Sequence, residues 1–193
     1  MPVKKFKLYP GYFYHIYNRV VDNNLLFREW KNYDFFLDKI KKYLLPEAEI
    51  LAFCLMPNHY HLLIKLTNQD YSKAMQKLAL SYVVAYNRIY SRKGRLFSSP
   101  YQRIHIKNPM YLLELSRYIH LNPIKAGLSK TPLDWKYSSC AEFVGLKAAD
   151  FINPTYILDI LSDDLSSTLA EQHQAYQNYV QEWIDQRERD EVP

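Results

Sequence analysis

The sequence predicts an α+β domain: an antiparallel sheet with helices packed on one face, followed by a helical, acidic C-terminal tail. Two observations carry this prediction. Strand-like and helix-like segments follow one another in the order β-α-β-β-α-β-α, and only Pro57-Asn58 separates the second strand from the third. A link that short cannot cross over between parallel strands, so these two strands pair antiparallel. The 193 residues are 48% apolar, which is enough to bury a sizeable core.

The first half of the chain predicts three strands and one helix. GYFYHIYNRV (11–20) is aromatic and β-branched, as is typical of a strand. Residues 30–44 place apolar side chains at helical spacing, and Pro46 ends that helix. EILAFCLM (49–56) then predicts a buried strand, with HYHLLIKL (59–66) as its hairpin partner.

The next segments predict a long helix and a short edge of sheet. We expect a helix over residues 70–94, with Asp70 or Ser72 as its N-cap and Gly94 just past its end. QRIHIK (102–107) predicts a short strand.

The last helix of the basic body and the tail complete the prediction. Residues 108–123 begin with Asn-Pro, a good N-cap and N1 pair, and end at a second Asn-Pro, which disfavours further helix. The order of elements implies a ferredoxin-like fold over residues 1–130. LSKTPLDW marks the boundary to an extension over residues 131–193, in which 154–163 and 167–185 have helical patterns.

Charge is divided unevenly along the chain. Residues 1–130 hold 21 Lys and Arg against 8 Asp and Glu, whereas residues 131–193 hold 4 against 12. A basic body with an acidic tail is typical of proteins that bind polyanions, so nucleic acid is the expected partner; a solvated surface with no special partner is the alternative. The candidate phosphate contacts are Lys4, Lys5, Lys7, Lys65, Arg88, Arg92, Lys93, Arg95, Arg103, Lys107 and Arg117.

Other residues of the body are candidates for contact with DNA. His15 and Arg19 share one face of the first strand and are expected to flank the site. Unpaired bases stack on aromatic side chains, and one or two members of a larger set are expected to serve as such platforms. That set is Tyr12, Tyr14, Tyr17, Phe97 and Tyr101.

Composition excludes several other classes of protein. The N-terminus is basic but lacks the apolar stretch of a signal peptide, and no segment is apolar enough to cross a membrane. No glycine-rich phosphate motif is present, so no nucleotide cofactor is expected. Cys54 and Cys140 are too few for a disulfide framework. We expect a cytoplasmic protein with no membrane partner, and both a monomer and a homodimer stay open.

Two histidines open the third predicted strand. His59 and His61 lie on one face with Lys65, on the open side of the sheet, whereas Tyr60 points the other way, into the core. Side chains at this spacing can hold one small cation together. The alternative is two partly exposed histidines that hydrogen bond to their neighbours.

A third ligand and a nucleophile are candidates in SRYIHLNPIKAG (116–127). Tyr118 and Asn122 are four residues apart and therefore lie on one helix face, while His120 points away from it and is expected to be structural. The Asn122 amide oxygen could complete a metal site. A phenol titrates near pH 10, and a nearby cation would both lower its pKa and polarise a phosphate.

These motifs resemble a known family. CLMPNHYHLLIK and SRYIHLNPIKAGL look like the two motifs of the REP-associated tyrosine transposases, which belong to the single-tyrosine branch of the HUH endonuclease superfamily. YHIYNRV (14–20) and GRLFSSPYQRIHI (94–106) match the family's first and last strands, and the likeness covers roughly residues 8–145.

The resemblance implies a chemistry. His59, His61 and Asn122 would bind a divalent metal, Mg²⁺ or Mn²⁺, and Tyr118 would attack a phosphodiester of single-stranded DNA. The products would be a 5′-phosphotyrosine link and a free 3′-OH, with no need for ATP, and the targets would be short palindromic REP hairpins. Two residues depart from the family pattern: Tyr60 replaces a smaller aliphatic residue, and Asn122 replaces a glutamine.

Two other functions stay open at this stage. A non-catalytic nucleic-acid-binding protein on the same fold would need only the charge distribution and the aromatic residues. A protein–protein module that uses the acidic tail is a weaker alternative.

Overall fold

The computed structural model describes residues 8–21, 24–162 and 166–190. Three of the predicted phosphate contacts, Lys4, Lys5 and Lys7, lie outside these ranges. The strands are β1 (Phe13–Arg19), β2 (Ala48–Met56), β3 (His59–Leu66) and β4 (Gln102–Ile106). The helices are α1 (Trp30–Leu44), α2 (Tyr71–Ile89), α3 (Pro109–Lys125), α4 (Cys140–Phe143), α5 (Thr155–Leu161) and α6 (Leu169–Asp190), with a 3₁₀ turn η1 at Pro132–Asp134.

The four strands form one sheet in the order β2-β3-β1-β4. Each neighbouring pair is antiparallel, which confirms the predicted α+β fold with an antiparallel sheet. The register places Tyr17 of β1 and Cys54 of β2 on either side of His61. The two central strands, β1 and β3, therefore carry the middle of the sheet on which the site is built.

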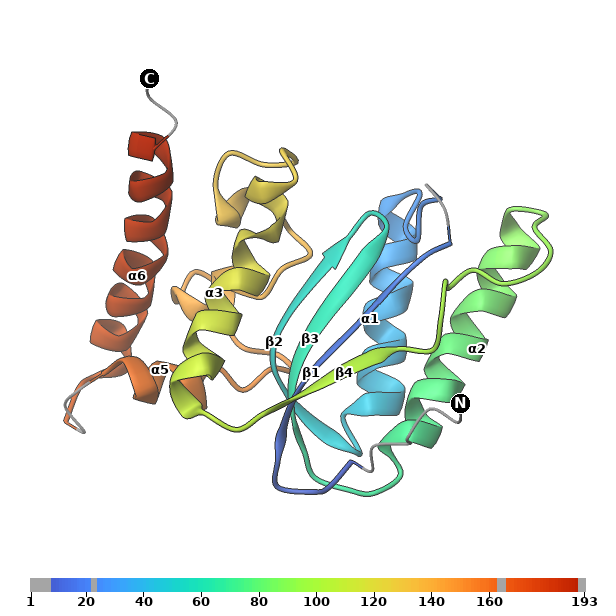
Figure 1. Ribbon diagram of the computed structural model, residues 1–193, viewed down its shortest axis with the longest axis horizontal. Coiled ribbons are helices and arrows are strands. Elements are labelled where there is room, and N and C mark those ends of the chain that lie inside the picture. Colours follow the sequence, from blue (N-terminus) through green and yellow to red (C-terminus); the bar gives the residue numbers. More distant parts are fainter. Residues whose placement is uncertain (1–7, 22–23, 163–165, 191–193) are drawn as a thin grey trace.

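The helices cover both faces of this sheet, and not one face as predicted (Figure 1). Helices α1 and α2 pack on the face of Tyr60, whose ring lies 5.1 Å from that of Phe36 in α1. Helix α3 contacts β2, β3 and β4 on the opposite face, and α5 and α6 follow it there (Figure 1). The reason lies in β2, which is buried at nearly every position and therefore needs apolar cover on both sides.

Two helix ends differ from the predictions. Helix α2 ends at Ile89 and not at 94, because Ser91 takes a left-handed conformation with φ of 49° and interrupts the helix. Ser72 does not cap this helix, since its hydroxyl bonds to that of Tyr101 at 3.1 Å. Helix α3 continues through Pro123 to Lys125, for a reason that bears on the site below.

The C-terminal helices are joined to α3 by a buried polar cluster. The Tyr176 hydroxyl of α6 lies 2.8 Å from Nδ1 of His120 and 2.9 Å from the hydroxyl of Ser116. The other ring nitrogen of His120 lies 2.8 Å from the hydroxyl of Ser139. His120 is thus fully buried and satisfied on both nitrogens, as expected of a structural residue. Among the described helices, none combines the length and the apolar character that crossing a membrane requires.

Candidate active site

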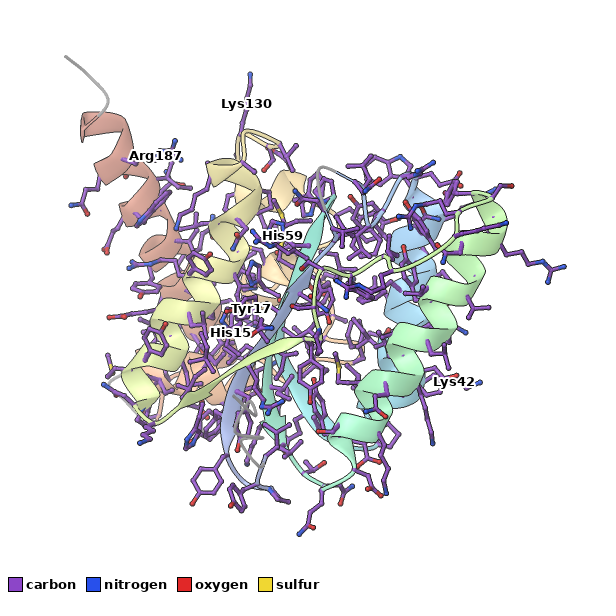
Figure 2. The ribbon with its side chains drawn as sticks, turned by 45° about the vertical axis from the view of Figure 1, so that its right-hand side comes forward. His15, Tyr17, Lys42, His59, Lys130 and Arg187 are labelled. Atoms are coloured by element: carbon purple, nitrogen blue, oxygen red, sulfur yellow. The ribbon has the colours of Figure 1, made fainter. Side chains whose placement is uncertain are left out.

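A cavity of about 480 Å³ lies between α3 and the histidine face of the sheet. Its walls include His15 and Tyr17 of β1, His61 of β3, and Tyr118 of α3. The view in Figure 2 shows His15, Tyr17 and His59 between the sheet and this helix. The face predicted to be open is therefore covered, and His61 is only 7% exposed. The physical reason is again β2, which is buried on both of its faces and is covered on this face by α3.

In each histidine of the pair, Nδ1 lies within hydrogen-bond distance of a neighbouring side chain. The rings of His59 and His61 lie 5.0 Å apart. Nδ1 of His59 lies 2.6 Å from the side-chain oxygen of Asn58, so it carries the proton and donates it. Nδ1 of His61 lies 2.9 Å from Nε2 of His15 on the neighbouring strand. In each ring Nε2 is thus the nitrogen that remains for a further partner, an arrangement common around metal-binding histidines.

Burial keeps all three imidazoles neutral. It lowers the pKa of His15 to about 4. Burial, followed by the charges of His15 and His59, lowers the pKa of His61 to about 2. Burial also lowers the pKa of His59, against a smaller opposing effect from a hydrogen bond with Asn122. A neutral imidazole is the form that binds a metal ion, so the pair is ready for one at neutral pH.

Asn122 is oriented by the proline that follows it. Pro123 has no backbone N–H and leaves the Ile119 carbonyl without its usual helical partner. The Asn122 amide nitrogen donates to that carbonyl at 3.4 Å and to the Tyr118 carbonyl at 2.7 Å. Because the nitrogen is turned to the backbone, the amide oxygen is left for the His59 ring, with which Asn122 also interacts. This substitute bond explains why α3 passes through Pro123.

Tyr118 lies beside the histidines within the same chain. Its ring centre is 5.7 Å from that of His61, and the side chain is 41% exposed. Lys125 Nζ lies 4.6 Å from the Tyr118 ring on one side and 4.8 Å from the Trp183 ring of α6 on the other. Partial desolvation, followed by the charges of Arg117 and Arg187, lowers the pKa of Lys125. A phenol open to substrate, a cation and two imidazoles thus meet at one point.

The donor set fits a divalent cation. His59 lies beside His61 and interacts with the Asn122 side chain, so two imidazoles of β3 and one amide of α3 are available as ligands. A group of three or more His, Cys, Asp and Glu side chains able to hold a metal is absent from the described residues. Asn122 and the two histidines would supply three ligands to a divalent cation and leave its other coordination positions open.

The predicted DNA contacts are scattered over the surface. Arg19 pairs with His59 in the sheet and is exposed near the site. His15 is buried on His61, which leaves it little surface for DNA. Arg117 is held by α6, with its guanidinium 3.8 Å from the Tyr179 ring. Lys65 lies at the other end of β3, over Tyr156.

The remaining predicted contacts lie between the end of α2 and the residue just after β4. Arg92 bonds to Asn87 and Arg95 bonds to the Ser98 carbonyl, so both brace the loop after α2. Arg88 and Lys93 are exposed near the same end of that helix. A second cavity, described below, is lined by Arg103 and Lys107.

Sequence reasoning missed several partners of the site. Asn58 stands directly before His59, and an asparagine in that position was a signal that could have been used. His15 could be found only by pairing β1 with β3 in the correct register. The position of Trp183 has no signal in the sequence, because α6 joins Lys125 across almost 60 residues of chain.

Comparison with known proteins gives a consistent result. A family model described as IS200-like transposase matches residues 12–122. The structure of a REP-associated tyrosine transposase bound to a REP hairpin superposes with a TM-score of 0.64 at 17% identity, covering 88% of this chain and 96% of that one. A candidate transposase of Deinococcus radiodurans reaches only 0.38 at 22% identity, over 61% of this chain and 95% of that one, too loose a likeness to support an argument. The comparison with curated proteins found no match.

Proposed function

Because the chain belongs to the IS200-like transposase family, we propose that it is a metal-dependent endonuclease and strand transferase of single-stranded DNA. The observation that carries the proposal is the meeting of Tyr118 with the histidine pair in one cavity of one chain. This arrangement suits phosphoryl transfer, where positioning and charge stabilisation do most of the work.

In this proposal Tyr118 is the nucleophile. Its Oη attacks the phosphorus of a phosphodiester, the bond to the 3′ oxygen breaks, and a 5′-phosphotyrosine forms. The phenol gives up its proton, and the departing 3′ oxygen takes one up as a 3′-OH. The reverse attack by a 3′-OH rejoins strands without ATP, since the phosphotyrosine keeps the energy of the broken bond.

His59, His61 and Asn122 would hold the divalent cation, Mg²⁺ or Mn²⁺. When bound, it supplies positive charge against the phosphate oxygens. Asn58 and His15 would orient the two imidazoles, because each lies within hydrogen-bond distance of Nδ1 of one ring. Lys125 adds a fixed positive charge beside the phenol, and α3 keeps water from the buried side of the cavity.

The proposed substrate is hairpin-forming DNA with a single-stranded flank. The structural relative with which this chain shares its fold is described in complex with a REP hairpin, which makes such a hairpin the first substrate to test. The basic body supports a polyanionic partner, and Arg19 lies where a phosphate next to the site would pass. Action on DNA would take place in the cytoplasm, by a monomer or a homodimer.

The test is formation of a covalent adduct. The full chain is incubated with hairpin-bearing single-stranded DNA and Mn²⁺, and the products are separated under denaturing conditions. We expect a protein–DNA adduct that is absent from Tyr118→Phe and present in Tyr111→Phe, a second exposed tyrosine at the same cavity. An adduct that persists in Tyr118→Phe would assign the nucleophile elsewhere. Tight hairpin binding with no adduct under any metal would favour a non-catalytic nucleic-acid-binding protein.

A further inference from the structure

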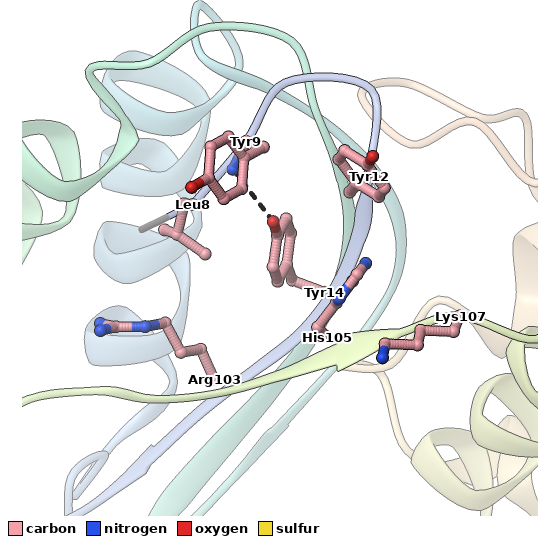
Figure 3. Close-up of a pocket in the computed structure, with 7 residues that line it drawn as sticks. All are labelled: Leu8, Tyr9, Tyr12, Tyr14, Arg103, His105 and Lys107. Atoms are coloured by element: carbon pink, nitrogen blue, oxygen red, sulfur yellow. Dashed lines mark hydrogen bonds between the residues drawn. The ribbon is translucent and has the colours of Figure 1, made fainter. Parts of the chain in front are cut away.

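A second cavity, of about 450 Å³, opens on the sheet face opposite to the histidines (Figure 3). It lies at the edge strand β4, where Arg103 and His105 point to one face of the sheet and Ile104 points to the other. Ile104 lines the catalytic cavity. Only the thickness of one strand therefore separates the two cavities.

The walls of this second cavity are aromatic. The Tyr14 ring lies 5.3 Å from that of His105, and the Tyr12 ring meets His105 edge-on at 5.0 Å. The Tyr14 hydroxyl accepts a hydrogen bond from the Tyr9 backbone N–H at 3.0 Å, which fixes the ring in the centre of the cavity (Figure 3). Tyr12 is half exposed, so one edge of this aromatic cluster is accessible from solvent.

The charged side chains of the cavity are all cationic. Arg103 and Lys107 line its β4 side, and no Asp or Glu is among the described residues that line it. Nε of Arg103 is buried and has no hydrogen-bond partner among the described residues. A buried donor without a partner is costly, so an arriving acceptor would gain the bond that the folded chain does not supply.

We infer that this cavity binds one unpaired nucleotide of the DNA strand, its base on the aromatic cluster and its phosphate at Arg103 and Lys107. Aromatic stacking beside guanidinium and ammonium groups is the chemistry that single-stranded nucleic acid requires. The inference rests on the proposed function, because it takes the ligand to be part of the strand that enters the catalytic cavity. That strand passes around the edge of β4, from one face of the sheet to the other.

The test places a fluorescent base at successive positions of the strand. Full-length Tyr118→Phe, which cannot react, is titrated with hairpin DNA that carries 2-aminopurine at one position of its single-stranded flank at a time. We expect quenching at one position. Tyr12→Ala and Arg103→Gln should remove it and weaken binding about 5- to 150-fold, as expected for the loss of one stacked base. Tyr12→Phe keeps the stacking ring and should bind as the parent does.

Controls separate this effect from a general loss of structure. Trp30→Ala removes another exposed aromatic side chain, one that lines neither cavity, and should leave the quenching unchanged. Thermal unfolding of each variant shows whether it is folded. Unchanged quenching and affinity in both folded Tyr12→Ala and Arg103→Gln would overturn the inference. Tighter binding of free deoxynucleoside monophosphate than of the strand would overturn the assignment to DNA.

The two proposals fail separately. If wild-type protein forms the covalent adduct but Tyr12→Ala and Arg103→Gln bind DNA normally, the nucleotide cavity is wrong and the transferase stands. If quenching depends on Tyr12 and Arg103 but no metal yields an adduct, the cavity stands and the catalytic proposal is wrong.

Discussion

At the scale of single residues, the candidate site depends on side chains outside the proposed ligands His59, His61 and Asn122. Asn58 and His15 each take one nitrogen of a histidine and thereby orient the other. Asn122 has its nitrogen taken by the helix backbone and so presents its oxygen. Each donor is aimed before any ligand arrives, which lowers the cost of organising the site.

The first prediction concerns His15. Replacing it with phenylalanine keeps an aromatic ring but removes the nitrogen that holds Nδ1 of His61. We expect His15→Phe to weaken Mn²⁺ binding about 10- to 100-fold, as measured by electron paramagnetic resonance of the free ion. His105→Phe, a histidine on the other face of the sheet, serves as the control. Wild-type affinity in His15→Phe would show that His61 is oriented without it.

The second prediction concerns Asn122 and Pro123. A carboxylate at position 122 cannot donate to the carbonyls of Tyr118 and Ile119, so Asn122→Asp should lower the free energy of unfolding by about 1–3 kcal/mol in urea denaturation. Pro123→Ala in the same chain supplies a backbone N–H for Ile119. The double variant should therefore regain part of the loss, and strict additivity of the two changes would contradict the proposed substitute bond.

At the scale of elements, the C-terminal helices hold α3 in place. Tyr176 forms hydrogen bonds with Ser116 and His120, and the Arg117 guanidinium lies over the Tyr179 ring. Trp183 packs on Lys125, whose Nζ also lies over the Tyr118 ring. The position of α6 therefore affects the surroundings of Tyr118, the residue proposed to attack DNA.

The third prediction tests that seating at Gly145. This residue has φ of 72°, and a Cβ there would overlap the His173 ring of α6. Gly145→Ala should lower the free energy of unfolding by about 1–3 kcal/mol. Gly127→Ala is the matched control, because φ is 67° but nothing lies near its Cβ, and it should cost less. Equal losses in thermal unfolding would mean that α6 yields without cost.

Local patterns predicted the elements well but not their surroundings. Helix 30–44 and strand 59–66 match α1 and β3 because apolar spacing and flanking prolines act within a few residues. The end of α3 was predicted wrongly because a side chain replaced the bond that Pro123 removes. Which helices cover which face depends on contacts between distant segments, and so does the pairing of His15 with His61. The pair of histidines and Tyr118 could be named from their motifs, but their separation could not.

At the scale of the whole molecule, one sheet separates two kinds of surface. The face toward α3 carries the cavity beside His61 and Tyr118, and the other face carries the core under α1 and α2 together with the cavity of Tyr14 and Arg103 at its edge. Charge is also divided between two parts of the chain, with the cations mainly in residues 1–130 and the acidic residues concentrated in the tail.

The fourth prediction concerns the stability of the whole fold in acid. Burial lowers the pKa of His120 to about 3 and that of His15 to about 4, both below the ordinary value of 6.5. The unfolded chain therefore binds more protons below pH 6.5, and stability should fall as the pH falls from there. Each such histidine contributes a slope of about 1.4 kcal/mol per pH unit. Urea denaturation between pH 6.5 and 4.5 should show a shallower slope in His120→Gln, and an unchanged slope would exclude His120 as a source.

Pro123 within α3 limits which side chains are tolerated at the neighbouring position 122. The Asn122 amide donates to the Tyr118 carbonyl and to the Ile119 carbonyl that Pro123 leaves without a backbone donor, so an acidic side chain at position 122 should destabilise the helix. The two histidines are neutral as well. A divalent ion held by these three neutral side chains would keep its full double charge, because none of them offsets it. That charge would then act on the negatively charged strand.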